Sequence, residues 1–144
     1  VVFDLDHFKA VNDVHGHAAG DRALRLVARC VQDALRADDV PGRLGGDEFV
    51  MLLHDARTSA ALAVADRIVQ RLQRQAAGSG LPAITLSFGM VEMGPGEPLD
   101  DALRRADRAL YEAKRQGRSR AVAAEGSEDQ PVFTESQRMG LRAA

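Results

Sequence analysis

The sequence has little cysteine, no excess of charge of one sign and no long apolar run, and each absence excludes a class of protein. Its 144 residues include one cysteine, Cys30, which excludes an internal disulfide framework and fits a reducing compartment. The formal net charge is -2, so no overall basic field favours binding to nucleic acid. No apolar run approaches the roughly 20 residues of a membrane-spanning helix, and no signal peptide pattern opens the chain. We therefore expect a cytoplasmic chain without a nucleic-acid partner and without membrane insertion by this segment.

The length suits one domain that can bury a real core. The chain starts at Val1, inside a strand-like run and without an initiator methionine, so we expect a piece of a longer protein. After Glu125 the sequence becomes polar and aperiodic, which is typical of a flexible extension. The prediction is a domain over 1–124 and a C-terminal tail over 125–144.

Hydrophobic periodicity predicts alternating strands and helices. Strands are predicted over 1–6, 40–44, 48–53, 83–90 and 119–123, and helices over 18–35, 58–75 and 99–116. The segment 83–90 alternates apolar with smaller or polar residues, which is the period of a half-buried strand, and residues 12–17 are predicted as a loop. The paired glycines Gly45 and Gly46 favour a tight hairpin, and Gly117 is placed as a helix C-terminal cap. This order contains the βαββαβ unit of ferredoxin-like folds plus one αβ element. It predicts an α+β fold with a mixed, mainly antiparallel sheet covered by helices.

Two acidic clusters lie at the ends of predicted strands. Asp4 and Asp6 end the strand in "FDLD", and Asp47 and Glu48 follow the glycines in "RLGGDEFVML". In a βαββαβ unit the first strand lies beside the hairpin, so the two clusters should converge. Convergent carboxylates suit Mg²⁺, and Asp4 and Asp47 are the predicted ligands. Each cluster taken alone is better explained as the polar end of a strand or the solvated part of a turn, and only the two together with the motifs below favour the metal site.

Cationic and backbone groups that could hold phosphate occur at both ends of the sequence. The stretch "DHFK" leads from the first strand into a helical turn, where free backbone N–H groups could bind phosphate oxygens near Lys9. Lys114 and Arg118 are four residues apart at a helix terminus, so both could reach one anionic group. Cations at a helix C-terminus also interact with the helix dipole, which leaves a structural explanation open.

A candidate for reading a nucleotide base is Asp21, together with Asn12. A carboxylate can accept two hydrogen bonds from N1–H and the N2 amino group of guanine, whereas adenine presents an acceptor at N1. Asp21 would then favour guanine. The alternative is that Asp21 is an acidic residue in the first turn of a helix.

Four motifs in order, "FDLDHFKAVND", "GHAAGD", "RLGGDEF" and "LYEAKRQGRSR", strongly resemble the GGDEF domain of bacterial diguanylate cyclases over roughly residues 1–123. The resemblance implies a palm-type fold and condensation of two GTP into cyclic di-GMP and two pyrophosphates. It further implies two Mg²⁺ or Mn²⁺ ions per active site and a catalytic homodimer. An upstream sensory or receiver domain is expected outside this chain. The family's opening helix, with a motif like "LTGLxNRR", is missing from the sequence.

The resemblance also implies roles for individual residues. Asp4, Asp47 and the backbone carbonyl of Leu5 would ligate the metals, and Glu48 would lie next to the reacting 3′-hydroxyl. The implied substrate-binding residues are Phe8, Lys9, Asn12, Asp21, Lys114 and Arg118. The stretch "RADD" matches the family's RxxD product-inhibition motif, with Arg36 and Asp39 binding cyclic di-GMP and Arg67 in support.

Two alternatives remain. One is a catalytically idle module that senses cyclic di-GMP through Arg36 and Asp39 or GTP through the acidic site, although the intact motifs argue against it. The other is a zinc module built on the four histidines His7, His15, His17 and His54. A single cysteine and the lack of paired ligand spacing argue against zinc.

Overall fold

The computed structural model describes residues 1–124, which form a five-stranded open sheet and four helices. The elements are β1 (Val2–Leu5), α1 (Phe8–His15), α2 (His17–Ala34), β2 (Val40–Gly45), β3 (Glu48–Leu52), α3 (Thr58–Ala76), β4 (Leu86–Met90), α4 (Leu99–Arg115) and β5 (Ala121–Ala123). The strand order is β2-β3-β1-β4-β5, with β4 and β5 parallel and the other pairs antiparallel. The predicted α+β class with a mixed sheet is therefore confirmed. The expected tail over 125–144 lies outside the described residues.

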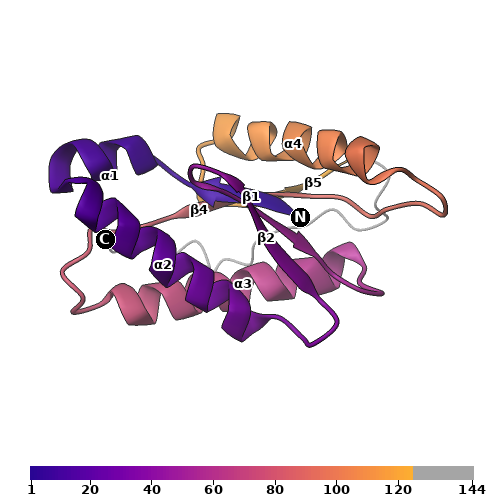
Figure 1. Cartoon of the computed structure of the whole chain (residues 1–144). Coiled ribbons are helices and arrows are strands. Elements are labelled where there is room, and N and C mark those ends of the chain that lie inside the picture. Colours follow the sequence, from indigo (N-terminus) through magenta and orange to yellow (C-terminus); the bar gives the residue numbers. More distant parts are fainter. Residues whose placement is uncertain (125–144) are drawn as a thin grey trace.

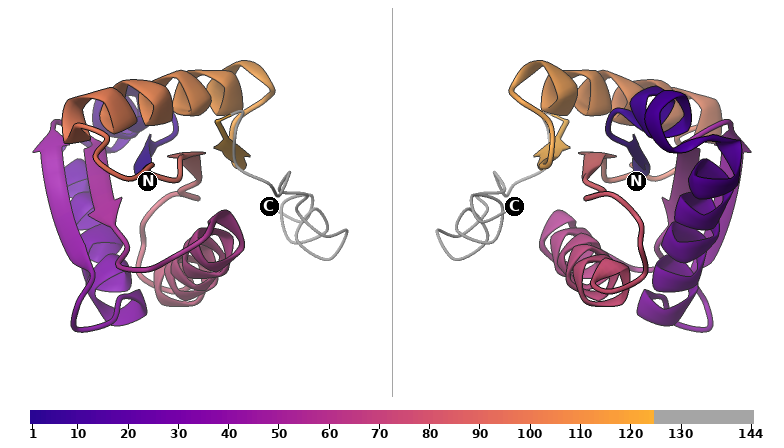
Figure 2. Two further views of the ribbon diagram at one scale, coloured as in Figure 1. Left: turned by 90° about the vertical axis from the view of Figure 1, so that its right-hand side faces the viewer. Right: turned by 90° about the vertical axis from the view of Figure 1, so that its left-hand side faces the viewer.

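Helices cover both faces of the sheet (Figures 1 and 2): α2 and α3 lie on one face and α4 lies on the other. Side chains alternate between the faces of a strand, so neighbouring residues of β1 enter different clusters. Phe3 and Leu5 pack in the larger core with α2 and α3, whereas Val2 packs against Ala106 and Leu110 of α4. Asp4 shares the face of Val2, which places its side chain under α4.

The strand β4 is buried along its whole length, which differs from the half-buried strand that its alternating pattern predicted. Gly89 explains the difference. A Cβ atom on Gly89 would lie 2.0 Å from the carbonyl oxygen of Ala106 and 2.4 Å from the backbone nitrogen of Leu110. The backbone of α4 therefore rests directly on β4, and only a glycine allows this approach.

The segment 12–17, predicted as a loop, is mostly helical. Helix α1 extends to His15, and Gly16, with φ of 79°, separates it from α2. Only Val11 of α1 is buried, so the helix has a weak periodic signal in the sequence. The short helix packs on α2 and continues the chain directly from the end of β1.

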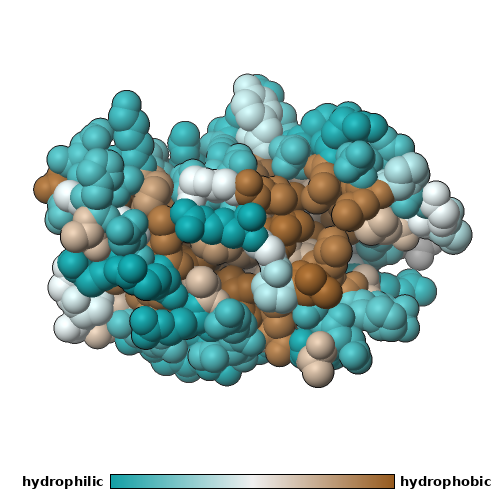
Figure 3. Space-filling model, in the orientation of Figure 1, coloured by the Kyte–Doolittle hydropathy of each residue, from teal (hydrophilic) through white to brown (hydrophobic). Residues whose placement is uncertain are grey.

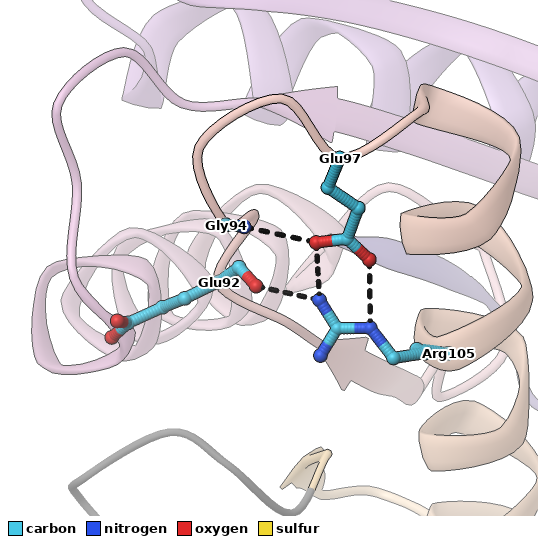
Figure 4. A network of polar contacts seen from close by, with 4 residues as sticks. All are labelled: Glu92, Gly94, Glu97 and Arg105. Atoms are coloured by element: carbon cyan, nitrogen blue, oxygen red, sulfur yellow. Dashed lines mark hydrogen bonds and ion pairs between the residues drawn. The ribbon is translucent and has the colours of Figure 1, made fainter.

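The connection between β4 and α4 is tied by one arginine, Arg105 (Figure 4). Its Nε and Nη2 donate to the two carboxylate oxygens of Glu97 at 2.9 and 2.7 Å, and Nη2 also donates to the carbonyl of Glu92 at 2.7 Å. Arg105 and the N–H of Gly94 hold the pKa of the Glu97 carboxyl below its usual range. This network anchors the first half of α4, whose far end carries Lys114.

Apolar side chains gather on one face between α4 and the β2–β3 hairpin (Figure 3). A hollow of about 500 Å³ lies there and is lined by residues that include Val1, Met51, Met90 and Leu103. Within residues 1–124, no helix has the length and apolar character needed to cross a membrane.

Candidate active site

The two acidic clusters meet where β1 ends and the hairpin turns. Asp4 of β1 lies opposite Glu48 of β3, and Asp47 immediately precedes Glu48. The hairpin is closed by Gly46, with φ of 45°, whose carbonyl accepts a hydrogen bond from Arg43 Nε at 3.0 Å. The predicted convergence is thus confirmed. We call Asp4, Asp47 and Glu48 the acidic edge.

The three carboxylates of the acidic edge differ in their exposure. Asp4 is buried, with 4% of its surface exposed, whereas Asp47 is half-buried and Glu48 is exposed. One oxygen of Asp4, Oδ2, forms an ion pair with Lys114 from the last turn of α4. The other, Oδ1, is buried without a hydrogen-bond partner. An unpartnered buried carboxylate oxygen is costly, so its presence points to a ligand.

Burial raises the pKa of Asp4 above its ordinary value of 3.8. The hydrogen bond and charge of Lys114 lower this pKa, and the nearby carboxylates of Asp47 and Asp6 raise it. The balance shows that Lys114 offsets only part of the unfavourable burial of the Asp4 charge. A divalent cation would offset more of it, because its charge is larger and oxygen is its preferred ligand.

The residues at the acidic edge fit a Mg²⁺-type ion that keeps several waters. Asp4 and Asp47 offer carboxylate oxygens, and Leu5 ends β1 between Asp4 and the turn into α1. Residues 1–124 contain no group of three or more His, Cys, Asp or Glu side chains that could hold a metal. The zinc alternative therefore gains no support from the described histidines, and any ion at the acidic edge would depend on two carboxylates and other oxygens.

The residues expected to contact the nucleotide flank the acidic edge on α1 and α2. Asn12 of α1 lies against Gly20 of α2: a Cβ on Gly20 would be 2.0 Å from Asn12 Oδ1. Gly20 therefore permits the close approach of α1, and it places Asn12 next to the residue preceding Asp21, which is exposed. Phe8, at the start of α1, packs partly against the core, and Lys9 is exposed.

The pair Lys114 and Arg118 is arranged differently from the predicted helical spacing. Helix α4 ends at Arg115, so Arg118 lies in the following turn instead of one helical turn above Lys114. Its N–H donates to the carbonyl of Ala113 at 3.0 Å, and Gly117 adopts φ of 109°, as in a common helix-ending motif. The C-cap residue is Gln116, and Gly117 directly after it ends the helix with a positive φ, which is the helix-ending role that the sequence predicted for it. The direction of the exposed Arg118 depends on this turn.

The "RADD" stretch forms a turn after α2. Asp39 accepts the N–H of Arg36 at 3.0 Å and the N–H of His54 at 3.1 Å, one on each carboxylate oxygen. Arg67 of α3 donates to the carbonyl of Ala34 at 2.9 Å, which places it at the same end of α2. The structure therefore brings Arg36, Asp39 and Arg67 to one region, away from the acidic edge.

Asp6 is a residue whose role the sequence did not reveal. It follows β1, is 6% exposed, and accepts hydrogen bonds from Thr85, Ser87 and the backbone of Ser119. A hint lies in "TLS", where two hydroxyl residues interrupt an apolar strand. Their partner could not be recognised because it lies about eighty residues earlier in the chain.

The architecture and the acidic edge define a class first: a palm-like α+β domain with carboxylates at the end of its central strands. A family model described as "Diguanylate cyclase, GGDEF domain" matches residues 1–120, and the chain belongs to this family. The chain is 39% identical over 124 residues to diguanylate cyclase DgcM of Escherichia coli. This match covers 86% of this chain and 30% of DgcM. The chain thus spans less than a third of the length of this curated relative.

Solved structures agree with this assignment. The active GGEEF domain of a Vibrio cholerae diguanylate cyclase matches with a TM-score of 0.78 and 34% identity, covering 88% of this chain and 81% of that one. The GGDEF domain of DgcB from Caulobacter crescentus, solved with c-di-GMP, matches with a TM-score of 0.74 and 36% identity, covering 87% and 76% of the two chains. Diguanylate cyclase SiaD of Pseudomonas aeruginosa matches with a TM-score of 0.79 and 40% identity, and the match covers 85% of this chain and 48% of that chain.

Proposed function

We propose that this chain condenses two GTP molecules into cyclic di-GMP and releases two pyrophosphates. The single observation that carries the proposal is the buried, unpartnered Oδ1 of Asp4 at the point where β1 meets the GGDEF hairpin. A folded protein retains such an atom where a ligand completes its coordination. The membership in the GGDEF family supplies the reaction class.

Two divalent cations, Mg²⁺ or Mn²⁺, would be held by Asp4, Asp47 and the carbonyl of Leu5. When bound, such ions stabilise the attacking oxygen and the charge that develops on the phosphate. Lys114, whose ammonium group pairs with Asp4, would become available to a phosphate if a bound ion neutralised that carboxylate.

The remaining groups bind and orient GTP. Asn12, which lies against Gly20, and the next residue along α2, Asp21, would accept and donate hydrogen bonds on the guanine edge. The backbone at Phe8 and the side chain of Lys9 would contact phosphates at the start of α1. Lys114 and Arg118 would hold the terminal phosphates, because hydrogen bonds between positively charged side chains and a highly charged phosphate group are strong.

The reaction joins the 3′-oxygen of one GTP to the α-phosphorus of a second and breaks that phosphorus's bond to pyrophosphate. Glu48, which is exposed at the hairpin, would accept the proton of the 3′-hydroxyl. Each domain would hold one GTP, and two identical steps close the ring. The active species is therefore an antiparallel homodimer in which two acidic edges face each other.

The turn formed by "RADD" would bind cyclic di-GMP and inhibit the enzyme. Arg36 is exposed and offers a bidentate fork to guanine O6 and N7. Asp39 holds two backbone N–H groups, so the turn is shaped before any ligand binds, and each of its oxygens retains a further lone pair. Arg67 supports the same region from α3.

The test is to incubate the chain at high concentration with GTP and Mg²⁺ and to identify the nucleotide products by mass. Cyclic di-GMP should form in the wild type and be absent in Asp47→Ala. Asp55→Ala, which removes an exposed carboxylate from the β3–α3 connection, is the matched control and should retain turnover. Formation of product by Asp47→Ala would refute the metal assignment.

The same samples separate the cyclase from an idle receptor. A receptor would bind cyclic di-GMP, show no product at any chain concentration and lose binding in Arg36→Ala. A cyclase that needs dimerisation would instead show turnover that rises more steeply than linearly with chain concentration.

A further inference from the structure

Asp6 connects the acidic edge to the turn that carries Arg118. Its Oδ2 accepts the Thr85 hydroxyl at 2.8 Å and the Ser119 N–H at 3.0 Å, and its Oδ1 accepts the Ser87 hydroxyl at 2.7 Å. The donors come from two places: the start of β4, and the segment between α4 and β5. One buried carboxylate therefore links the end of β1 to both.

The turn after α4 needs such support because its backbone is strained. Arg118 and Ser119 adopt φ of 61° and 49°, directly after Gly117. A left-handed conformation costs a residue with a Cβ roughly 1–2 kcal/mol, and it persists only where the surroundings impose it. The N–H of Arg118 is held by its own helix, whereas the N–H of Ser119 is held by Asp6.

The partners of Asp6 distinguish it from Asp4, two residues earlier. Both carboxylates are buried, but both oxygens of Asp6 accept hydrogen bonds, whereas Oδ1 of Asp4 accepts none. Asp6 therefore stabilises neighbouring segments of the protein, whereas Asp4 keeps one oxygen that a ligand can contact.

We propose that Asp6 is a positioning residue that fixes the left-handed turn at Arg118 and Ser119, and thereby directs Arg118 to the terminal phosphate of a nucleoside triphosphate. The inference rests on the proposed function, which places that phosphate at Lys114 and Arg118. It adds that discrimination between a triphosphate and a diphosphate depends on a buried carboxylate that touches neither nucleotide nor metal.

The experiment compares the affinities of 3′-deoxy-GTP and 3′-deoxy-GDP, which lack the attacking hydroxyl and cannot turn over. The wild type should bind the triphosphate at least about tenfold more tightly than the diphosphate, because the positive side chains of Lys114 and Arg118 contact the additional phosphate. Arg118→Ala should reduce this ratio, and Asp6→Ala should reduce it to the same extent. The double variant should show no further reduction, since both changes remove one contribution.

Two further variants separate positioning from stability. Asp6→Asn should keep the ratio, because its amide oxygen can accept from Thr85 and Ser119 while its NH₂ donates to the Ser87 hydroxyl. Thr58→Val removes a buried hydroxyl that donates to Glu92, beyond the other end of β4, so it should lower Tm and leave the ratio unchanged.

The outcomes are distinguishable. A folded Asp6→Ala variant with the wild-type ratio would overturn the inference and leave the proposed function intact. If that variant does not fold, Thr85→Val combined with Ser87→Ala frees Asp6 from β4 and should also reduce the ratio; an unchanged ratio there would equally overturn it. A wild type that binds neither nucleotide would overturn the proposed function, and the inference with it.

Discussion

The acidic edge and the "RADD" turn both rely on an aspartate with restricted exposure, yet the two carboxylates have opposite surroundings. Asp4 is buried against Lys114 and has one oxygen without a partner. Asp39 is half-buried, and each of its oxygens accepts a backbone N–H, from Arg36 and His54. The carboxylate of Asp4 therefore lacks a hydrogen-bond partner for one oxygen, whereas the carboxylate of Asp39 uses both oxygens to hold the backbone of its own turn.

The hydrogen bonds of a carboxylate thus indicate whether it belongs to a ligand site or stabilises the fold of the protein without ligand. A carboxylate that satisfies backbone N–H groups stabilises the fold whether or not a ligand is present. A buried carboxylate with a missing partner and a raised pKa destabilises the unliganded fold and is stabilised by a cation. Removal of Asp4 should therefore affect turnover, and removal of Asp39 should affect stability and regulation.

Asp4→Ala gives the largest expected effect and tests the comparison directly. Initial rates of cyclic di-GMP formation should fall on the order of a thousandfold, because the variant loses a metal ligand. Asp39→Ala should retain the initial rate within about twofold, since its partners lie away from the acidic edge. Equal losses in the two variants would contradict the comparison.

Gly20→Ala extends the comparison to the proposed guanine site. The new Cβ would occupy the position of Asn12 Oδ1 and displace that side chain. Affinity for GTP should fall about tenfold through the loss of a hydrogen bond to the base. The preference of a helix for alanine over glycine, about 1 kcal/mol, should offset part of the cost of crowding Asn12 and Phe8, whose Cε2 would lie 3.2 Å from the new Cβ, so stability should change less than affinity. Isothermal titration and thermal unfolding measure the two effects, and unchanged GTP affinity would argue against Asn12 as a base contact.

Arg36→Ala sharpens the functional side of the comparison. Inhibition by cyclic di-GMP should weaken about tenfold, because a bidentate contact to guanine is lost, and the uninhibited initial rate should not change. Rates measured over a range of added product give the inhibition constant. Arg29→Ala, an exposed arginine on α2, is the matched control. Loss of inhibition in the control as well would indicate a general charge effect.

Asp39→Ala sharpens the structural side. It leaves two backbone N–H groups without their acceptor and should lower the free energy of unfolding by about 1 kcal/mol. Asp38→Ala, the exposed neighbour, should change it by less than about half of that. Chemical denaturation of both variants measures the difference. A similar loss in both would show that the turn does not depend on the carboxylate of Asp39.

The smallest expected effect is the pH dependence of Asp4 in metal-free protein. Its pKa is raised in the folded state, so the folded protein binds the proton more tightly than the unfolded chain. The wild type should therefore lose stability relative to Asp4→Asn as the pH rises from about 3.8 through the folded-state pKa, and the difference should be constant above it. Tm differences at pH 4 and pH 7 in chelator test this sign. A reversed difference would mean that the attraction of Lys114 outweighs burial.

Much of the fold and of the acidic edge could be predicted from the sequence, because these features depend on local pattern. Hydrophobic periodicity located the strands and most helices, and the glycines beside Asp47 indicated the hairpin. The order of elements then brought Asp4 to Glu48. Helix α1 was missed because a helix with one buried residue, Val11, gives almost no periodic signal.

The sequence by itself determined the strands, three of the four described helices, the family and the meeting of the two acidic clusters. Only the tertiary structure decided which carboxylates are satisfied. Asp6 finds its partners 79, 81 and 113 residues away, and Arg118 takes its direction from a strained turn instead of a helix. Local propensity reaches a few residues along the chain, whereas the hydrogen bonds of a buried group depend on which distant segments the fold places around it.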